Sequence, residues 1–206
     1  MREIKVVRKA KLARRAKAVR KIKLLLTTLI VVFIAFLSLE KMLMSKISEE
    51  TNLREQIYSY MQVEKNQKTV FNSAIALNNG DSANTCVYFV AEVLRRNNVR
   101  ISEDTCNTAQ LIEILKEKGW KKDNNYKNLK PGDIVFTTDG MGNKNGVPTH
   151  TYVFMDWVEE GSYDYAYICD NQAKDYDNKV YHIRNVKSPD NANGFTKDAF
   201  SFFMKP

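Results

Sequence analysis

The stretch from Leu24 to Leu39 most constrains how this chain can fold, because it contains no charged residue and is almost wholly apolar. Extended to 22–44, it would form a helix of about 34 Å at 1.5 Å per residue, against about 30 Å for the hydrocarbon core of a bilayer. Lys23, Glu40 and Lys41 flank this core and can reach the two interfaces. The sequence therefore predicts one membrane-spanning helix, assigned to residues 24–44.

A secretory signal sequence is the alternative interpretation of this stretch, since its apolar part is short. Cleavage needs small residues two positions apart, and that pattern is absent. Ala35 is followed by Phe36 and Leu37, and Ser38 has Phe36 two positions before it. We therefore expect an uncleaved anchor, and both interpretations export the rest of the chain.

The charge of the chain is concentrated before the apolar stretch. Residues 1–23 hold 11 of the 32 basic residues and one of the 24 acidic ones, so this tail carries about +10 and the remainder about −2. By the positive-inside rule the tail is cytoplasmic and Ser45 onward lies outside. The tail lacks interleaved aromatics or a recognised nucleic-acid motif, so we expect contact with anionic lipid and no nucleic-acid partner.

The remaining chain divides into a charged segment and a patterned one. Apolar residues in 40–68 are spaced too irregularly for a heptad repeat, so we expect a juxtamembrane stalk over 45–65 and one globular domain over 66–206. Three helices are predicted in that domain: 70–77, ended by Asn78–Asn79–Gly80; 86–96; and a segment from Asn107 or Thr108 to Gly119. Strands are predicted at 134–136, 149–157, 165–172, 180–183 and 199–204. This order predicts an α+β domain, with N-terminal helices packed on an antiparallel sheet.

Cys86 begins a segment whose apolar positions 87, 90 and 94 recur at helical spacing, which places its thiol at a helix N-terminus. Unsatisfied backbone amides and the positive end of the helix dipole favour a thiolate there. Cys86 is therefore the candidate nucleophile.

His150, one of two histidines, precedes a β-branched and aromatic run that predicts a strand. A cysteine on a helix and a histidine on a later strand are one way to build a nucleophile and its base. A third group has to orient the imidazole, and the predicted strand 165–172 ends in Asp170, Asn171 and Gln172. We favour Asp170, with Asn171 or Gln172 as alternatives. Strand alternation puts Asn171 on the opposite face from the other two, so Asp170 and Asn171 cannot both point at the histidine.

Other residues compete for these roles. Cys106 also precedes a predicted helix, but the negative charge of 102–104 would raise its pKa rather than lower it. His182 is the alternative base, but it lacks a polar strand end nearby in sequence, so we expect a surface or packing role. Cys169 completes an odd set of three cysteines; whether it pairs with Cys106 or both are small buried residues stays open. The loop 139–146 is expected to be a flexible rim over the cleft, or a plain connector.

Several other chemistries are not indicated. Cysteines and histidines do not occur in pairs at metal-ligand spacing, and no serine-nucleophile elbow or glycine-rich nucleotide motif is present. We therefore expect no metal and no other cofactor.

The segments "SANTCVYFVAEVLRR", "LKPGDIVF", "PTHTYVFMDW" and "YAYICDNQ" follow one another in the order found in papain-like cell-wall hydrolases. Over residues 66–206 the chain resembles these enzymes, both the CHAP amidase/peptidase family and the NlpC type. The resemblance implies a papain-like fold and a catalytic set of Cys86, His150 and Asp170. It also implies hydrolysis of amide bonds in peptidoglycan.

The chain departs from both patterns next to the cysteine. CHAP members often have glutamine where this chain has Thr85, and NlpC-type members often have Asp–Cys–Ser–Gly where it has Thr–Cys–Val–Tyr. The oxyanion donor therefore stays open. The backbone amide of Cys86 is one candidate, with Asn84, Asn171 and Gln172 as weaker candidates for oxyanion or substrate contacts.

The expected function is that of a single-pass membrane protein with an extracytoplasmic thiol hydrolase acting on peptidoglycan peptides. The alternative is a non-catalytic module that keeps this fold to bind wall peptides or to scaffold an envelope assembly. Transfer of the acyl group to an amine is a third outcome that the same chemistry permits. The lysine- and asparagine-rich composition would suit a low-GC Gram-positive bacterium.

Overall fold

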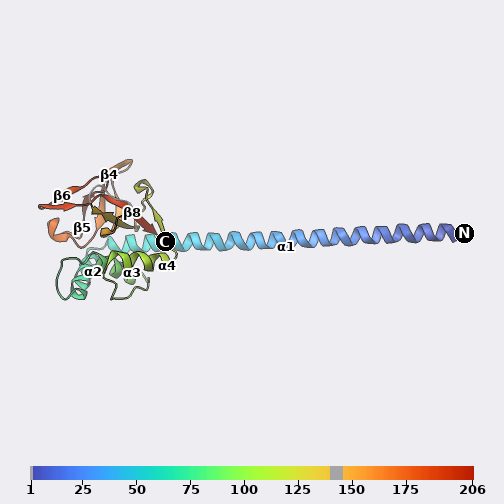
Figure 1. Ribbon diagram of the computed structural model, residues 1–206, viewed down its shortest axis with the longest axis horizontal. Helices are drawn as coiled ribbons and strands as arrows, with labels where there is room; N and C mark the ends of the chain where they lie inside the picture. The colour runs from blue at the N-terminus through green and yellow to red at the C-terminus, as the bar shows by residue number, and fades with distance from the viewer. Residues whose placement is uncertain (1, 140–145) are drawn as a thin grey trace. The chain divides into compact units, whose positions relative to one another are not determined.

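The computed structural model describes residues 2–139 and 146–206 (Figure 1). The chain forms two compact units, one up to Glu49 and one from Glu50 to Pro206. Most of the loop expected to form a flexible rim, 140–145, lies outside the described residues.

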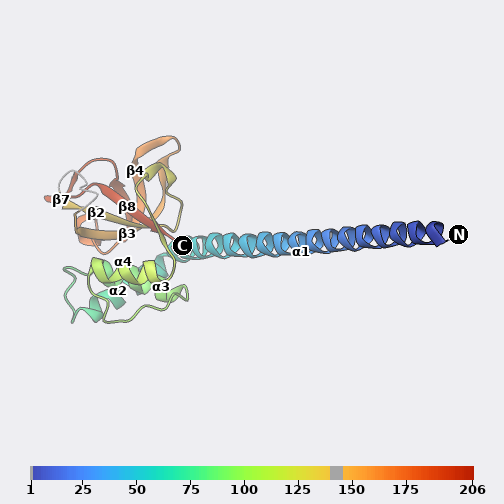
Figure 2. The same cartoon turned by 45° about the vertical axis from the view of Figure 1, so that its right-hand side comes forward.

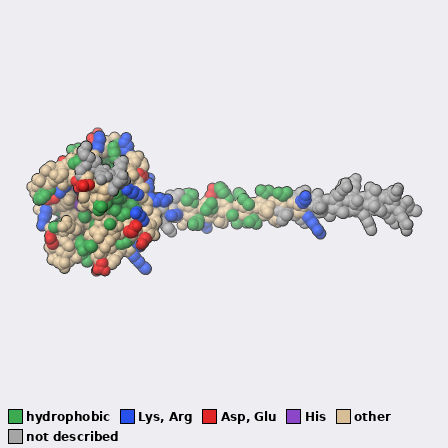
Figure 3. Space-filling model, viewed as in Figure 1, with side chains coloured by type: hydrophobic (Ala, Val, Ile, Leu, Met, Phe, Trp, Pro, Cys, Tyr) green, Lys and Arg blue, Asp and Glu red, His purple; other side chains and the backbone are tan. Residues whose placement is uncertain are grey.

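The first unit consists of the N-terminal part of helix α1 (Arg2–Met61). Within it, Leu25–Lys46 has a mean hydropathy of 2.0 and is long and apolar enough to cross a membrane. Its large apolar side chains are exposed, and Figure 3 shows them along this part of the helix. The prediction of one N-terminal apolar helix is confirmed; a signal sequence meets the same criteria, so the choice of an anchor stays a prediction.

The second unit is an α+β domain, as predicted: helices come first and a sheet follows. Its helices after α1 are α2 (Glu64–Leu77), α3 (Cys86–Arg96) and α4 (Thr108–Glu117), with short 3₁₀ turns η1 (Tyr126–Asn128) and η2 (Ala173–Asp175). Figure 2 shows α2, α3 and α4 together on one side of this unit and the strands on the other.

The ends of these helices follow the stop and start signals of the sequence. After α2 the chain turns at Asn79 and Gly80, which have φ of +55° and +85°, and the Gly80 amide donates to the Ile75 carbonyl. Asn107 caps α4 in a reciprocal pair with Gln110. Local sequence therefore sets where each helix ends.

The sheet has six antiparallel strands in the order β1-β8-β2-β3-β4-β5. Their bounds are β1 (Lys121–Asp123), β2 (Ile134–Thr138), β3 (Pro148–Glu159), β4 (Ser162–Cys169), β5 (Tyr181–Asn185) and β8 (Phe200–Lys205). A separate hairpin joins β6 (Asp190–Ala192) to β7 (Phe195–Lys197). The last strand of the chain thus inserts between β1 and β2.

Strand β3 is central to the core because both of its faces are covered. Val153 and Met155 pack in one apolar cluster with residues of the helices, whereas Tyr152 and Phe154 pack in a second cluster with residues of β4 and β8. This explains why the sequence from 150 to 155 shows no alternation of polar and apolar residues.

The expected stalk over 45–65 differs from the structure in its C-terminal part. Ile57 and Met61 are fully buried in the helix-side cluster, and the Gln67 side chain donates to the Met61 carbonyl over 2.7 Å. The compact unit therefore begins at Glu50 rather than at residue 66. Leu53, Ile57 and Met61 recur every four residues, so they lie on one face of the helix, and this face packs on the domain. This spacing is not a heptad repeat, so a heptad pattern does not reveal it.

Candidate active site

Cys86 is the first residue of α3, with Thr85 at the N-cap, so the prediction of a thiol at a helix N-terminus is confirmed. The preceding loop is shaped by its own polar groups: Asp81 accepts from the Ala83 amide, and Asn84 has a φ of +55°. The Cys86 side chain is half-buried. The thiol therefore lies against the protein on one side and faces a pocket on the other.

His150 lies on β3, as predicted, next to an irregularity in the sheet. Thr137 of β2 pairs with His150 and Thr138 pairs with Pro148, so the intervening Thr149 is bulged out of register. Bulges change the direction of the side chains beside them. The sheet is thus locally adjusted at the residue before the histidine.

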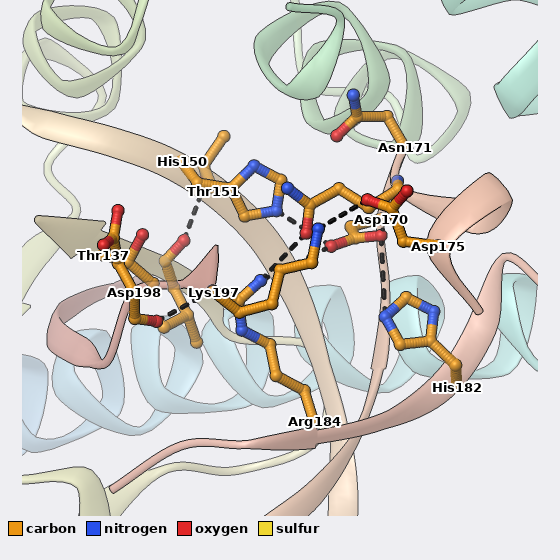
Figure 4. Close-up of polar contacts among 12 residues, drawn as sticks. Thr137, His150, Thr151, Asp170, Asn171, Asp175, His182, Arg184, Lys197 and Asp198 are labelled. Carbon is orange, nitrogen blue, oxygen red and sulfur yellow. Dashed lines mark hydrogen bonds and ion pairs between the residues drawn. The ribbon is translucent and has the colours of Figure 1, made fainter. Parts of the chain in front are cut away.

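Asp170 follows directly after β4 and is fully buried. Its Oδ2 lies 2.8 Å from Nε2 of His150 (Figure 4). Its Oδ1 accepts from the Gln172 amide over 2.8 Å. Because Nε2 faces Asp170, Nδ1 is the ring nitrogen left for the thiol of Cys86.

The Cys86 thiol and the His150 imidazole stabilise each other's charged forms. Burial opposes ionisation of the thiol, but a hydrogen bond from His150, its charge, and the backbone amides of Thr151 and Val87 outweigh burial and lower the pKa of Cys86. Burial likewise disfavours the imidazolium, yet Asp170 and Cys86 raise the pKa of His150 above its ordinary value. These shifts favour a thiolate–imidazolium pair.

Asp170 stays ionised despite complete burial. Burial raises its pKa, but the charge of His182, the hydrogen bond and charge of His150, and the charge of Arg184 outweigh burial and hold the pKa of the carboxyl well below its usual range. The Arg184 guanidinium lies 3.9 Å from Oδ2, and its side chain is 1% exposed. A carboxylate therefore remains beside His150 throughout the pH range in which histidines titrate.

The weaker candidates lie around the same pocket with different contacts. Asn171 donates to the Thr85 hydroxyl over 3.0 Å and so ties the end of β4 to the N-cap of α3. Gln172 accepts from Arg184 over 3.1 Å. Asn84 is exposed at the rim. Of the three strand-end residues, it is Asp170 that contacts the histidine.

A pocket of about 150 Å³ opens beside the thiol and the imidazole. Its lining is mostly polar and comes from five parts of the chain: Asn84 and Cys86; Thr149 and His150; Asn171 and Gln172; Arg184; and Thr196, Lys197 and Asp198. Asp198 accepts from the Thr149 hydroxyl over 2.7 Å, and Lys197 is ion-paired with Asp175. The end of β7 and the residue that follows it thus form one wall of the pocket.

Three residues of the site were not predicted in these roles. Arg184 and Lys197 are nearly fully buried cations, a rare state for these residues. His182 was expected to have a surface or packing role, but its Nε2 lies 3.7 Å from Oδ1 of Asp170. The alternation of His182 and Arg184 on β5, next to the strand that ends at Asp170, was the available signal.

The competing cysteines lie elsewhere. Cys106 is exposed before α4, where its sulfur contacts Gln110, and Cys169 is fully buried in the core. Both are free thiols in this structure. Among the side chains that the structure describes, no three from His, Cys, Asp or Glu are grouped so that they could hold a metal ion.

The arrangement supplies the three elements of thiol catalysis: an activated sulfur, a base that can accept its proton, and a carboxylate that orients the base. No known protein family, curated protein or solved structure matches the chain. The interpretation of the site therefore rests on its own geometry.

Proposed function

We propose that this protein is a cysteine hydrolase, anchored in the membrane by its N-terminal apolar helix, that cleaves amide bonds in the peptides of peptidoglycan outside the cytoplasm. The observation that carries the proposal is the alignment of a half-buried thiol at the start of α3, the His150 imidazole that hydrogen-bonds to it, and a buried carboxylate 2.8 Å from that imidazole. Each group is held by a different element, and each shifts the ionisation of its neighbour in the direction catalysis requires.

The proposed reaction proceeds through a thioester. The thiol proton of Cys86 passes to Nδ1 of His150, and the sulfur adds to the carbonyl carbon of the amide. The C–N bond then breaks as His150 returns the proton to the leaving amine. Water adds to the thioester while His150 accepts its proton, and breakage of the C–S bond releases the acid and restores the thiol.

Other groups act in this scheme without forming bonds to carbon. Asp170 holds His150 with Nε2 toward itself and stabilises the imidazolium that forms. The backbone amide of Cys86, at the free N-terminal end of α3, is the proposed oxyanion donor, with the exposed Asn84 side chain as a second contact.

The substrate class is supported by the pocket and by the order of the segments. A narrow, mostly polar pocket suits a peptide with polar groups near the scissile bond better than an apolar ligand. The sequence resembles CHAP and NlpC-type hydrolases in the order of its helix, turn and strands, and a papain-like fold is part of the proposal. The proposed topology, with a cytoplasmic basic tail, follows from the charge distribution.

A digest of purified peptidoglycan by the full chain in detergent tests the proposal, with the products identified by mass spectrometry. The wild type should release fragments that have gained one water, and Cys86→Ala should release none while unfolding at the same temperature. Cys106→Ala is the matched control, because this cysteine is exposed and lies outside the pocket. It should cleave like the wild type.

Two results would contradict the proposal. Cleavage by Cys86→Ala would show that another group carries the reaction. Binding of peptidoglycan without cleavage by the folded wild type would favour the alternative, a non-catalytic wall-binding module.

A further inference from the structure

The Asp170 carboxylate has imidazoles on two sides. His150 contacts Oδ2 over 2.8 Å, and His182 faces Oδ1 with its Nε2 3.7 Å away. Figure 4 shows the two rings on different sides of the carboxylate. The pairing of Ile168 on β4 with His182 on β5 places the second ring beside the strand end that carries Asp170. The proposed mechanism uses one of these imidazoles and leaves the other without a role.

The tautomer of His182 is fixed by its other nitrogen. Nδ1 lies 3.0 Å from the carbonyl oxygen of Lys179, which can only accept, so Nδ1 carries a hydrogen. In the neutral ring Nε2 is then a lone pair. It is buried and makes no hydrogen bond within the described parts of the chain. A neutral His182 therefore directs a lone pair toward a buried carboxylate.

The ring has little freedom to turn away. Tyr176 stacks on it with 3.6 Å between the ring centroids and 14° between the planes, and His182 is 6% exposed. Gln172 already donates its amide to the same oxygen of Asp170. A protonated His182 would instead have an Nε2–H directed at Oδ1, as a second cationic donor to Asp170.

The groups around His182 oppose each other. Burial lowers its pKa, as do the charges of Arg184 on β5 and His150 on β3, while Asp170 after β4 and the Lys179 carbonyl raise it; the result is a pKa below the ordinary value. The other charged groups near the ring, Asp177 and the Lys179 ammonium, are exposed at the rim of a pocket of about 330 Å³. His182 is thus neutral while His150 is active and gains its proton on acidification.

We propose that His182 is a positioning residue of the site: as a neutral ring it leaves the Asp170 carboxylate to His150, and when protonated it competes with His150 for that carboxylate. The role in turnover rests on the proposed function, whereas the competition for Asp170 does not. Protonation of His182 should weaken the hold of Asp170 on the imidazolium of His150. Activity should then fall on the acid side with two ionisations rather than one.

The competition can be measured without any turnover, because the chain has only two histidines. We would label the full chain in detergent with ¹⁵N-histidine and follow both imidazoles by NMR against pH, assigning them with His182→Asn. His182 should show the Nδ1–H tautomer and should titrate at lower pH than His150. The His150 signal should shift again as His182 takes up its proton, and this additional step should be absent in His182→Asn.

The kinetic arm uses the same variant and a second one. Asn at position 182 can keep a donor toward the Lys179 carbonyl but cannot become a cation, so the acid limb of its kcat/KM profile should change from a slope of two to a slope of one. His182→Phe keeps a ring that can stack on Tyr176 and also cannot become a cation, so it should show the same slope of one.

These outcomes separate this proposal from the previous one. A His182 ring with hydrogen on Nε2, or a His150 titration that is identical in wild type and His182→Asn, would overturn the role of His182 whatever the enzyme activity. A loss of kcat/KM in the His182 variants that is equal at every pH, with the slope of the acid limb unchanged, would also overturn it, since a merely structural residue has that effect. Absence of cleavage would contradict the proposed function and leave the NMR result decisive for His182.

Discussion

Asp170 in the candidate site and Asp133 in the turn before β2 are both fully buried carboxyl groups, and their environments act in opposite directions. His150, His182 and Arg184 surround Asp170 and keep its pKa low. Asp133 accepts from the Lys130 amide over 2.8 Å, but the cation nearest to its other oxygen is Arg54, 3.8 Å away. Burial therefore dominates and raises the pKa of Asp133 to about 7.

The difference shows that burial alone does not decide whether a carboxyl group is charged. Burial disfavours the carboxylate in both places, and the number and closeness of cations and donors decide the outcome. In the site this preserves a fixed negative charge beside a histidine. In the turn it creates a carboxyl group that takes up a proton near neutral pH.

The largest expected effect comes from removing the charge of Asp170. Asp170→Asn keeps the shape of the side chain but leaves the buried Arg184 without its carboxylate, which should lower the free energy of unfolding by about 3–5 kcal/mol. Urea titration followed by tryptophan fluorescence reports on this unit, since Trp120 and Trp157 both lie in it. Asp164→Asn, at an exposed ion pair with Lys187, should lower the unfolding free energy far less, because solvent screens this pair. Equal losses of unfolding free energy in Asp170→Asn and Asp164→Asn would show that the buried charge of Asp170 matters no more than an exposed one.

The turn itself should be intolerant of a side chain. Gly132 has a φ of +92°, and a Cβ there would lie 2.2 Å from the Arg54 carbonyl oxygen of α1. Gly132→Ala should therefore cost about 2–4 kcal/mol, the sum of backbone strain and overpacking. Gly161→Ala is the matched control, because its φ is +85° and nothing lies within 4 Å. It should cost about 1 kcal/mol in the same denaturation experiment, from backbone strain alone. A Gly132→Ala loss no larger than this would show that α1 does not pack closely on the turn.

Asp133 should make stability fall as pH rises. Its folded pKa of about 7 lies above that of an unfolded aspartate, so its contribution is greatest below pH 4 and is lost as pH rises toward 7. The wild type should lose roughly 1 kcal/mol per pH unit relative to Asp133→Asn between pH 5 and 7. The measurement is the difference in unfolding free energy between the two proteins, with the exposed Asp156→Asn as control. A difference that does not change with pH would contradict the high pKa of Asp133.

Sequence patterns were sufficient where the decisive interactions are local. The helix start at Cys86 follows from apolar residues at helical spacing, and the start at Thr108 follows from its capping residue Asn107. The strand of His150 and the strand end at Asp170 follow from apolar and β-branched runs. A cysteine nucleophile and a histidine base require a third polar group that orients the imidazole. The set of Cys86, His150 and Asp170 could therefore be proposed from residue types and their order alone.

The patterns failed where a residue depends on contacts far along the chain. No sequence motif marks His182 and Arg184 as part of a site, and they become part of it only because β5 pairs with β4. The segment before residue 66 has the composition of a stalk, yet Ile57 and Met61 are buried against residues of the domain. In both cases the partner is supplied by another part of the fold.

The sequence by itself determined the apolar N-terminal helix, the order of helices and strands, and the residue types able to carry thiol chemistry, because these depend on short-range spacing and composition. The tertiary structure decided which polar residue after β4 faces His150, that two imidazoles and an arginine share one carboxylate, and where the domain begins. The physical reason is that ionisation and burial depend on distances of a few ångströms between strands, and these distances are set by how the strands pair.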